Sequence, residues 1–245
     1  MRLLRTEAPA VAAPPLTGAE FRAALSALEP RYWDAHPFHT RLHQGLLDED
    51  GLRLWVANRW YYQRSIPQKD AAILANCPLA EVRRQWLPRI VYHDGADAGS
   101  GGTEMWLRLA EAVGLSRAAV LSEEHVLPGV RFAVDAYISF ARRQPWLESV
   151  ASGLTELFSP GLLRHRLRRL REHYPWIADQ GLAYFTARLD VVEAEGAGTL
   201  DLVVRHATTR AQQDACVAAL SFKCQVLQAV LDAVDYRYTA AQAKP

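Results

Sequence analysis

Residues 55–72 read WVANRWYYQRSIPQKDAA. Their apolar and aromatic residues recur every three or four positions, which predicts a helix that Pro67 breaks or kinks. On this helix Arg59, Tyr62 and Gln63 share one face, because they are spaced by three and four residues. Two interpretations are open. The face is a wide aromatic core surface with Arg59 extending to water, or it is the wall of a pocket for an anionic, oxygen-rich ligand.

Length and composition predict one large globular domain. The chain has 245 residues, of which 50% are hydrophobic and 22% are charged, so a sizeable core can be buried. We expect residues 1–16 to be a flexible tail, residues 17–240 to form a single domain and residues 241–245 to be a C-terminal tail.

Charge and cysteine content narrow the function classes. A formal net charge of +1 gives no reason to expect nucleic acid or an anionic membrane as partner. Cys77, Cys216 and Cys224 are too few and too scattered for a disulfide framework, so reduced thiols in the cytoplasm are expected. No uninterrupted apolar run approaches the roughly 18 residues of a membrane span.

Helical patterns follow one another along the rest of the chain, and no segment has the period of a strand. Thr17 and Glu20 form a capping-box pattern, and Thr and Ser caps are expected at two later helices. The predicted helices cover residues 17–28, 80–92, 103–113, 116–125, 127–143, 145–158 and 162–171, a segment from 181, and two helices between 198 and 238. The fold class is therefore all-α.

Three histidines could share one face of a short helix. His36, His39 and His43 stand at i, i+3 and i+7, and imidazole is the commonest metal ligand. Two interpretations are again open, a metal site or a polar face without metal. The second is favoured, because no carboxylate stands at helical spacing to complete a ligand set and paired Glu and Glu-x-x-His motifs are absent from the sequence.

Several polar residues interrupt otherwise apolar patterns. Glu156 stands inside an apolar run and needs a cationic or hydrogen-bonding partner. His93 ends a helix, where the helix dipole would raise its affinity for a proton. The basic run at 162–171 is expected to be a solvated face with one inward arginine, and Arg131 with Asp135 a structural i, i+4 pair.

The out-of-pattern set is rich in cations. It comprises Arg59, Tyr62, Gln63, Lys69, His93, Tyr137, Glu156, Arg166, Tyr184, Arg188 and Lys223. Cations outnumber acids in this set although the whole chain is balanced, which indicates a ligand with several carboxylates. The sequence shows no Gly-rich phosphate loop or nucleotide fingerprint.

Five motifs carry a resemblance to a known family. They are VANRWYYQRSIPQKDAAILANCP at 56–78, RIVYHDG at 89–95, LPGVRFAVDAY at 127–137, LTELFSP at 154–160 and HYPWI at 173–177. Together they resemble the pyrroloquinoline-quinone (PQQ) synthase family over nearly the whole chain, from about Thr17 to Tyr238. The resemblance implies a single-domain, heme-oxygenase-like helical bundle and a homodimer in the cytoplasm.

The resemblance also implies a reaction. The family closes a ring in a reduced polycarboxylate precursor of PQQ (AHQQ) and removes eight electrons from it. Dioxygen is the acceptor, hydrogen peroxide is released, and neither a metal nor an organic cofactor is used. The protein would then hold carboxylates, move protons and keep dioxygen in a dry pocket.

Position by position, the resemblance implies roles for the polar set. Substrate-binding residues would be Arg59, Tyr62, Gln63, Lys69, Tyr137, Glu156, Arg166 and Lys223. His93 would be the general acid or base, with Tyr184 and Arg188 at the oxygen site.

Two positions depart from the family pattern. Trp33 and Leu163 stand where family members carry histidine, which suggests a rearranged proton relay, with His36 or His165 as possible members, or impaired oxidation.

Rival functions exist on the same fold. They are a metal-dependent oxidase or oxygenase, a thiaminase-like hydrolase, and a protein that only binds PQQ or its precursor. Metal analysis would identify the first, and a failure to change colour when air is admitted would identify the last.

Overall fold

The computed structural model describes residues 13–243 and confirms the all-α class. Within this range the chain forms helices and turns and contains no strand. The long helices are α3 (Glu49–Asn76), α4 (Ala80–Asp94), α5 (Gly101–Ala112), α7 (Pro128–Arg143), α9 (Ser159–His173), α10 (Ala183–His206) and α11 (Arg210–Gln242). Shorter ones are α1 (Gly18–Ser26), α2 (Pro37–His43), α6 (Arg117–Ser122), α8 (Trp146–Ser152) and the 3₁₀ helices η1 (Glu29–Arg31), η2 (Trp33–Ala35), η3 (Gly153–Leu157) and η4 (Asp179–Leu182).

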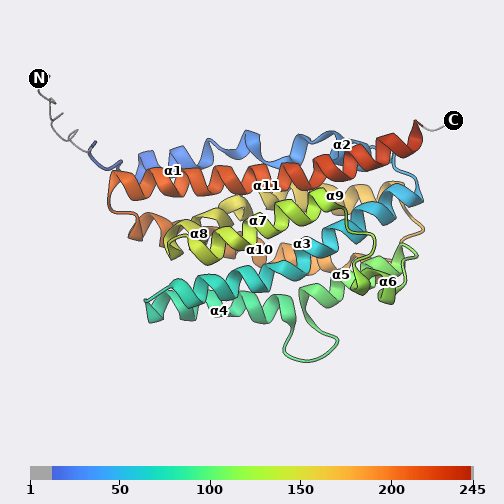
Figure 1. The fold of residues 1–245 in the computed structure, drawn as a ribbon, viewed down its shortest axis with the longest axis horizontal. Coiled ribbons are helices and arrows are strands. Elements are labelled where there is room, and N and C mark those ends of the chain that lie inside the picture. Colours follow the sequence, from blue (N-terminus) through green and yellow to red (C-terminus); the bar gives the residue numbers. More distant parts are fainter. Residues whose placement is uncertain (1–12, 244–245) are drawn as a thin grey trace, which may run out of the picture.

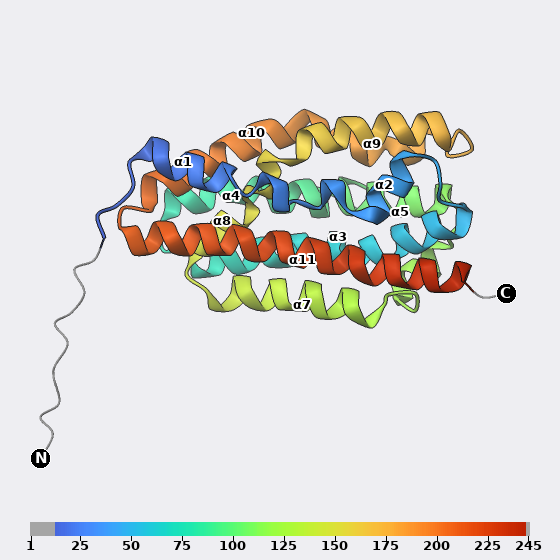
Figure 2. The ribbon, with the colours of Figure 1, turned by 90° about the horizontal axis from the view of Figure 1, so that it is seen from above.

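The helices pack as one bundle whose long axes run roughly parallel (Figure 1). Helix α11 extends along the length of the bundle and packs against α7, α8 and α3. Seen from above, α9 and α10 lie along one side and α7 along the other (Figure 2). One continuous hydrophobic cluster fills the space between them, so the described residues form a single domain.

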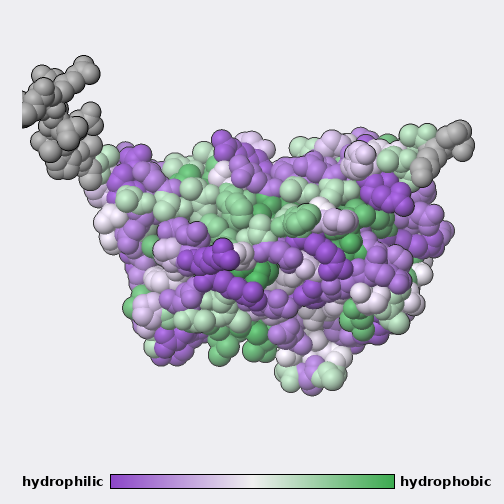
Figure 3. Space-filling view, viewed as in Figure 1, coloured by the Kyte–Doolittle hydropathy of each residue, from purple (hydrophilic) through white to green (hydrophobic). Residues whose placement is uncertain are grey.

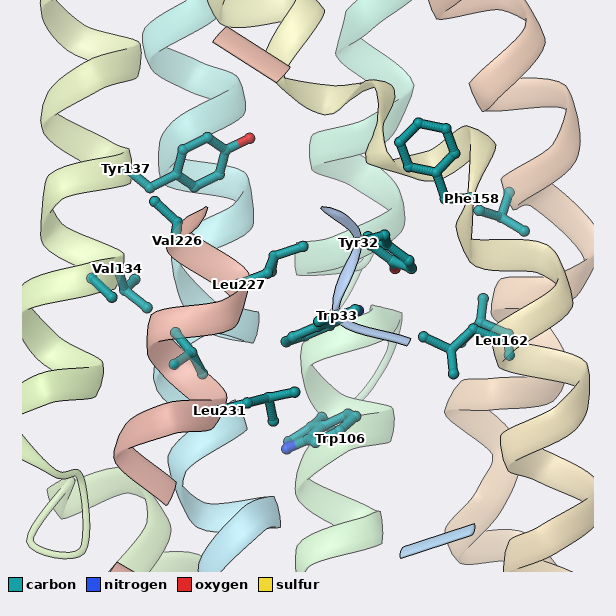
Figure 4. Packing of buried hydrophobic residues seen from close by; sticks show 14 of the residues in the cluster. Tyr32, Trp33, Trp106, Val134, Tyr137, Phe158, Leu162, Val226, Leu227 and Leu231 are labelled. Atoms are coloured by element: carbon teal, nitrogen blue, oxygen red, sulfur yellow. The ribbon is translucent and has the colours of Figure 1, made fainter. Parts of the chain in front are cut away.

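The segment between α1 and α2 enters the core. Tyr32 and Trp33 are 8% and 3% exposed. Figure 4 shows them between Leu227 of α11 and Leu162 of α9. Tyr32 and Trp33 therefore fill the space between α11 and α9.

Helix α3 passes through Pro67 without a break. It begins after Asp48, whose side chain accepts a hydrogen bond from the backbone N–H of Gly51, and it continues for 28 residues to Asn76. Of the two predicted effects of Pro67, a break or a kink, the break does not occur, and Lys69 belongs to the same helix as Arg59. Packing of α3 against α7, α4 and α5 stabilises the helix despite the missing proline N–H.

Several predicted boundaries are also wrong. The helix expected over 145–158 is divided into α8 and η3, and α6 ends at Ser122 rather than at residue 125. Helix α10 continues through Gly198, where a new helix was expected, because Gly in mid-helix costs only about 1 kcal/mol. The capping box of Thr17 and Glu20 is confirmed.

Two predicted side-chain arrangements differ from the structure. Arg131 binds the carboxylate and the backbone carbonyl of Glu123, and Asp135 instead accepts a hydrogen bond from the Tyr61 hydroxyl. Thr103 lies inside α5 and donates to the backbone carbonyl of His93 rather than capping the helix.

The surface mixes hydrophilic residues with smaller apolar areas on the face drawn in Figure 3. By length and composition alone α11 could span a membrane, since its mean hydropathy is 1.4 over 18 residues. Half of that window is buried in the bundle, and a core helix has the same composition. Asp214, Lys223 and Asp232 interrupt this helix, so it contains no uninterrupted apolar run of the expected length.

The three cysteines are free and buried. Cys216, Cys224 and Cys77 are 0%, 1% and 3% exposed, respectively. The expectation of unpaired thiols therefore agrees with the structure. Of the expected tails, residues 1–12 and 244–245 lie outside the described part of the chain.

Candidate functional site

One cavity in the middle of the bundle gathers ten of the eleven predicted site residues. The exception is Gln63. The walls of the cavity come from α3, α4, α7, η3, α9, α10 and α11, and Trp33 and Leu163 line the cavity as well. Figure 4 shows the apolar part of this region, with Tyr137, Trp33 and Leu162 around it. The packing of seven segments from across the chain therefore produces the predicted constellation.

Arg59 lies in this cavity rather than extending to bulk water. Its guanidinium stacks over the rings of Trp33 and Tyr62, with its central carbon 4.7 and 4.1 Å from the ring centroids. One of its terminal nitrogens is buried without a hydrogen-bond partner. The pocket-wall interpretation of this helix face is the one that the structure supports, because a buried unpaired donor is costly unless a ligand completes it.

Arg166 is the single inward arginine of the basic run, as predicted. It is 4% exposed, and one terminal nitrogen donates to Nε2 of His39 over 2.9 Å. Nδ1 of His39 lies 2.9 Å from the backbone carbonyl of Trp33, so it must carry the proton and leave Nε2 as the acceptor. Burial is the main cause, and the nearby Arg59 a smaller one, of a pKa of Arg166 lowered to about 10.

Lys223 is held between two phenol rings. Tyr62 and Tyr137 are stacked with centroids 6.5 Å apart and an interplanar angle of 4°. The amine nitrogen lies 4.0 and 3.6 Å from these two centroids and 2.6 Å from the Tyr62 hydroxyl. Burial, followed by the charges of Lys69 and Arg59, places the pKa of Lys223 well below its ordinary value.

The carboxylate of Glu156 pairs with two arginines beside the cavity. Arg89 binds both carboxylate oxygens of Glu156 over 2.6 and 2.7 Å, and Arg188 donates to the same carboxylate over 3.0 Å. Arg188 also binds Glu195. Burial would raise the pKa of Glu156, but Arg89 and Arg188 outweigh it and lower this pKa to about 2.

Lys69 is paired as well. It forms a salt bridge with the fully buried Asp70, whose carboxylate also accepts a hydrogen bond from the Trp86 ring over 2.8 Å. The cavity therefore has paired cations at Arg188 and Lys69, and cations held by neutral groups at Arg59 and Arg166.

Sequence reasoning missed Arg89, Glu195 and Asp70, and it considered His39 as a metal ligand but not as a partner of Arg166. A signal existed for Arg89, because it opens the motif RIVYHDG and the buried Glu156 required a cation. Glu195 and Asp70 have no distinguishing pattern in the sequence.

His93 lies at the C-terminal end of α4 and is 5% exposed. The helix dipole was expected to favour its protonation, but the pKa of His93 is lowered well below its ordinary value. Burial is the largest cause, followed by the charges of Arg188 and Lys69. The imidazole is therefore neutral at neutral pH and able to accept a proton.

Gln63 lies behind His93 rather than in the cavity wall. Its side-chain nitrogen is 3.3 Å from Nδ1 of His93, and its side-chain oxygen is buried without a partner. If the side-chain amide of Gln63 is rotated by 180°, its oxygen can accept a hydrogen bond from a protonated Nδ1 of His93. Gln63 can therefore support either tautomer of His93, which differs from the predicted contact with substrate.

Two of the three histidines of the predicted face, His39 and His43, lie side by side with stacked rings whose centroids are 5.9 Å apart. His36 precedes α2 as its N-cap and lies 3.1 Å from Asp232, whereas His39 contacts Arg166 and His43 stacks edge-on against His165 with centroids 4.6 Å apart. Within residues 13–243 no three His, Cys, Asp or Glu side chains are placed to hold a metal ion. Neither His36 nor His165 lines the cavity, so neither is placed to replace the histidines absent at Trp33 and Leu163.

Three buried histidines predict sensitivity to acid. His39, His43 and His93 are 0%, 7% and 5% exposed, and burial is the main cause of the lowered pKa of each, to about 3 for His43. They take up protons from solvent at a lower pH in the folded protein than in the unfolded chain, so their contribution to stability is complete above about pH 6.5 and is lost as pH falls below it. We expect the free energy of unfolding to decrease by about 1.4 kcal/mol per pH unit for each histidine, measured by urea denaturation.

The variant His43→Gln tests the assignment, because it removes one of the three titrating groups. Its free energy of unfolding should depend less steeply on pH than that of the unaltered protein. A free energy that is constant between about pH 6.5 and pH 5 would contradict the assignment.

Comparison with known proteins gives concordant results. Residues 22–233 match the model of the TENA/THI-4/PQQC family. The chain is 50% identical over 228 residues to a pyrroloquinoline-quinone synthase of Cronobacter sakazakii, covering 93% of this chain and 91% of the relative. It is 51% identical over 220 residues to one of Pseudomonas aeruginosa, covering 90% and 88%.

Solved structures match the fold at low identity. A domain of unknown function with a heme oxygenase-like fold from Shewanella denitrificans has a TM-score of 0.77 at 15% identity, covering 93% of this chain and 96% of that one. A TenA homolog from Pseudomonas syringae has a TM-score of 0.72 at 10% identity, covering 91% and 94%. The predicted heme-oxygenase-like architecture is thereby confirmed.

Proposed function

The chain belongs to the TENA/THI-4/PQQC family, and from this premise we propose that it is a pyrroloquinoline-quinone synthase. Its relatives with this name are about half identical to it over most of their length. The observation that carries the proposal is the cavity in which Arg59 and Arg166 have no carboxylate partner. Buried guanidinium groups of this kind are suited to carboxylates of a ligand.

We further propose that the reaction is an oxidation of the polycarboxylate precursor by dioxygen, with ring closure and release of hydrogen peroxide. Arg59 and Arg166 would bind carboxylates, and the stacked rings of Tyr62 and Tyr137 would border the ring system. His93 is neutral and buried, so it would accept protons from carbon as the precursor is oxidised. Arg188, which pairs with Glu156 and Glu195, and Tyr184 would stabilise reduced oxygen.

The proposed reaction uses no metal or organic cofactor. The support is chemical, because a quinol-like substrate can pass electrons to dioxygen itself, and because His36 and His39 are engaged with Asp232 and with Arg166. A cytoplasmic location and a homodimer remain predictions from the family resemblance.

Oxygen consumption tests the whole proposal. Purified protein in chelator-treated buffer should consume dioxygen when the PQQ precursor is added, with appearance of quinone absorbance and peroxide. Activity that disappears with a chelator and returns with Fe(II) would favour a metal-dependent oxidase. Precursor binding with no change on admission of air would favour a binding protein.

Arg59→Ala should weaken binding of PQQ by about 1.5–3 kcal/mol, the range for a hydrogen bond to a charged group. Arg64→Ala is the matched control, because Arg64 lies on the same helix but forms a salt bridge with Glu123 away from the cavity. Calorimetric titration would measure both. Equal affinities of Arg59→Ala and the unaltered protein would place the carboxylate site elsewhere.

A further inference from the structure

Lys223 differs from the paired basic groups of the cavity. Lys69 has Asp70, and Arg188 has Glu156 and Glu195. Lys223 is 1% exposed, and among the described residues no carboxylate lies within salt-bridge distance of its amine. Its hydrogen-bond partner is the neutral hydroxyl of Tyr62.

The groups around this amine do not replace a counter-ion. Facing it are Arg59, Tyr62 and Lys69 from α3, Tyr137 from α7, Glu156 from η3 and Cys224 from its own helix. Two of these are cations, and the carboxylate of Glu156 is already shared by two arginines. The faces of two phenol rings attract an ammonium by only about 0.5–2 kcal/mol each.

A fully buried charge without a counter-ion is unfavourable, and an amine avoids the cost by losing its proton. Arginine cannot respond in this way at neutral pH, so Arg59 and Arg166 keep their charges. Lysine is the cavity cation that can exist in either state. The direction in which burial moves the pKa of Lys223 agrees with this argument.

We propose that Lys223 is an uncharged amine in the ligand-free protein and that it takes up a proton when an anionic group of the ligand enters the cavity. The proposal rests on the proposed function for the nature of the ligand, a polycarboxylate. An arriving carboxylate supplies the missing counter-ion, so the ammonium form becomes favourable. Binding is therefore coupled to proton uptake. A ligand that places no negative charge beside Lys223 does not form this ion pair and binds more weakly.

Calorimetry in buffers of different ionisation enthalpy measures this coupling directly. PQQ should bind the full chain at neutral pH with uptake of about one proton, read from the dependence of binding enthalpy on buffer enthalpy. Lys223→Met should bind more weakly and lose the uptake. Lys223→Arg, which carries a permanent charge, should lose the uptake while it retains more of the affinity than Lys223→Met.

The outcomes separate this inference from the proposed function. Binding of PQQ without proton uptake, or the same uptake in Lys223→Met, would overturn the inference and leave the proposed function intact. Failure of PQQ to bind at all would count against the proposed function.

A measurement on the ligand-free protein makes the inference independent of binding. Lysine labelled with ¹³C at Cε should give one signal, absent from Lys223→Met, with the chemical shift of a neutral amine at neutral pH. A signal that titrates near the ordinary lysine pKa of about 10.4 would overturn the inference, whether or not PQQ binds.

Discussion

His93→Asn is expected to bind the PQQ precursor almost normally and to lose turnover by about 10²–10⁴-fold, the contribution of a positioned general base. Asparagine keeps a hydrogen-bonding group of similar size but cannot titrate. Among the described residues His93 is the imidazole that lines the cavity, so no second histidine is in place to take over. A partly oxidised intermediate should accumulate under air, detected by absorbance in single-turnover experiments.

The matched control for this experiment is His165→Asn. His165 lies near the surface, packed against His43 and outside the cavity lining, so its replacement should leave turnover unchanged. Quinone formation at the full rate by His93→Asn would show that another group accepts the protons.

Arg89→Met is expected to destabilise the folded protein by about 3–5 kcal/mol, the usual effect of removing one partner of a buried ion pair. Arg89 is 6% exposed and binds both oxygens of Glu156, so its loss leaves a buried carboxylate with Arg188 as its remaining close partner. The same change should reduce turnover, because Arg188 would be drawn toward Glu156. Urea denaturation measures the first effect and steady-state oxygen uptake the second.

Arg164→Met provides the comparison for stability. Arg164 pairs with Glu193 on the surface, where both side chains are about 60% exposed, and such pairs contribute about 0–1 kcal/mol. If Arg89→Met and Arg164→Met unfolded at the same urea concentration, the buried network would not contribute to stability as inferred.

Sequence patterns were sufficient for the helical class, and they identified ten polar residues that line one cavity. Apolar periodicity reports which face of a helix is buried, so a polar residue on such a face stands out, as Glu156 and Lys223 do. Helix ends were predicted less well, because α3 continues through Pro67 and α10 through Gly198. At both positions tertiary packing outweighs the local preference of the residue.

The electrostatic state of each group could not be predicted from the sequence. Position at a helix end suggested a raised pKa for His93, whereas burial beside Arg188 and Lys69 lowers it. Lys223 was expected to be a cationic ligand contact, and only the absence of a neighbouring carboxylate identifies its different character. Such properties depend on distances between segments far apart in the chain.

The placement of the sulfur atoms has a consequence for the durability of the proposed enzyme. Hydrogen peroxide oxidises thiolates far more readily than thiols, and it must reach the sulfur to do so. Burial raises the pKa of Cys216 to about 12 and that of Cys224 to about 11, and all three cysteines are at most 3% exposed. Peroxide released by the proposed reaction would meet Cys216 and Cys224 as buried, protonated thiols, so these two cysteines should escape sulfenic acid formation over many turnovers.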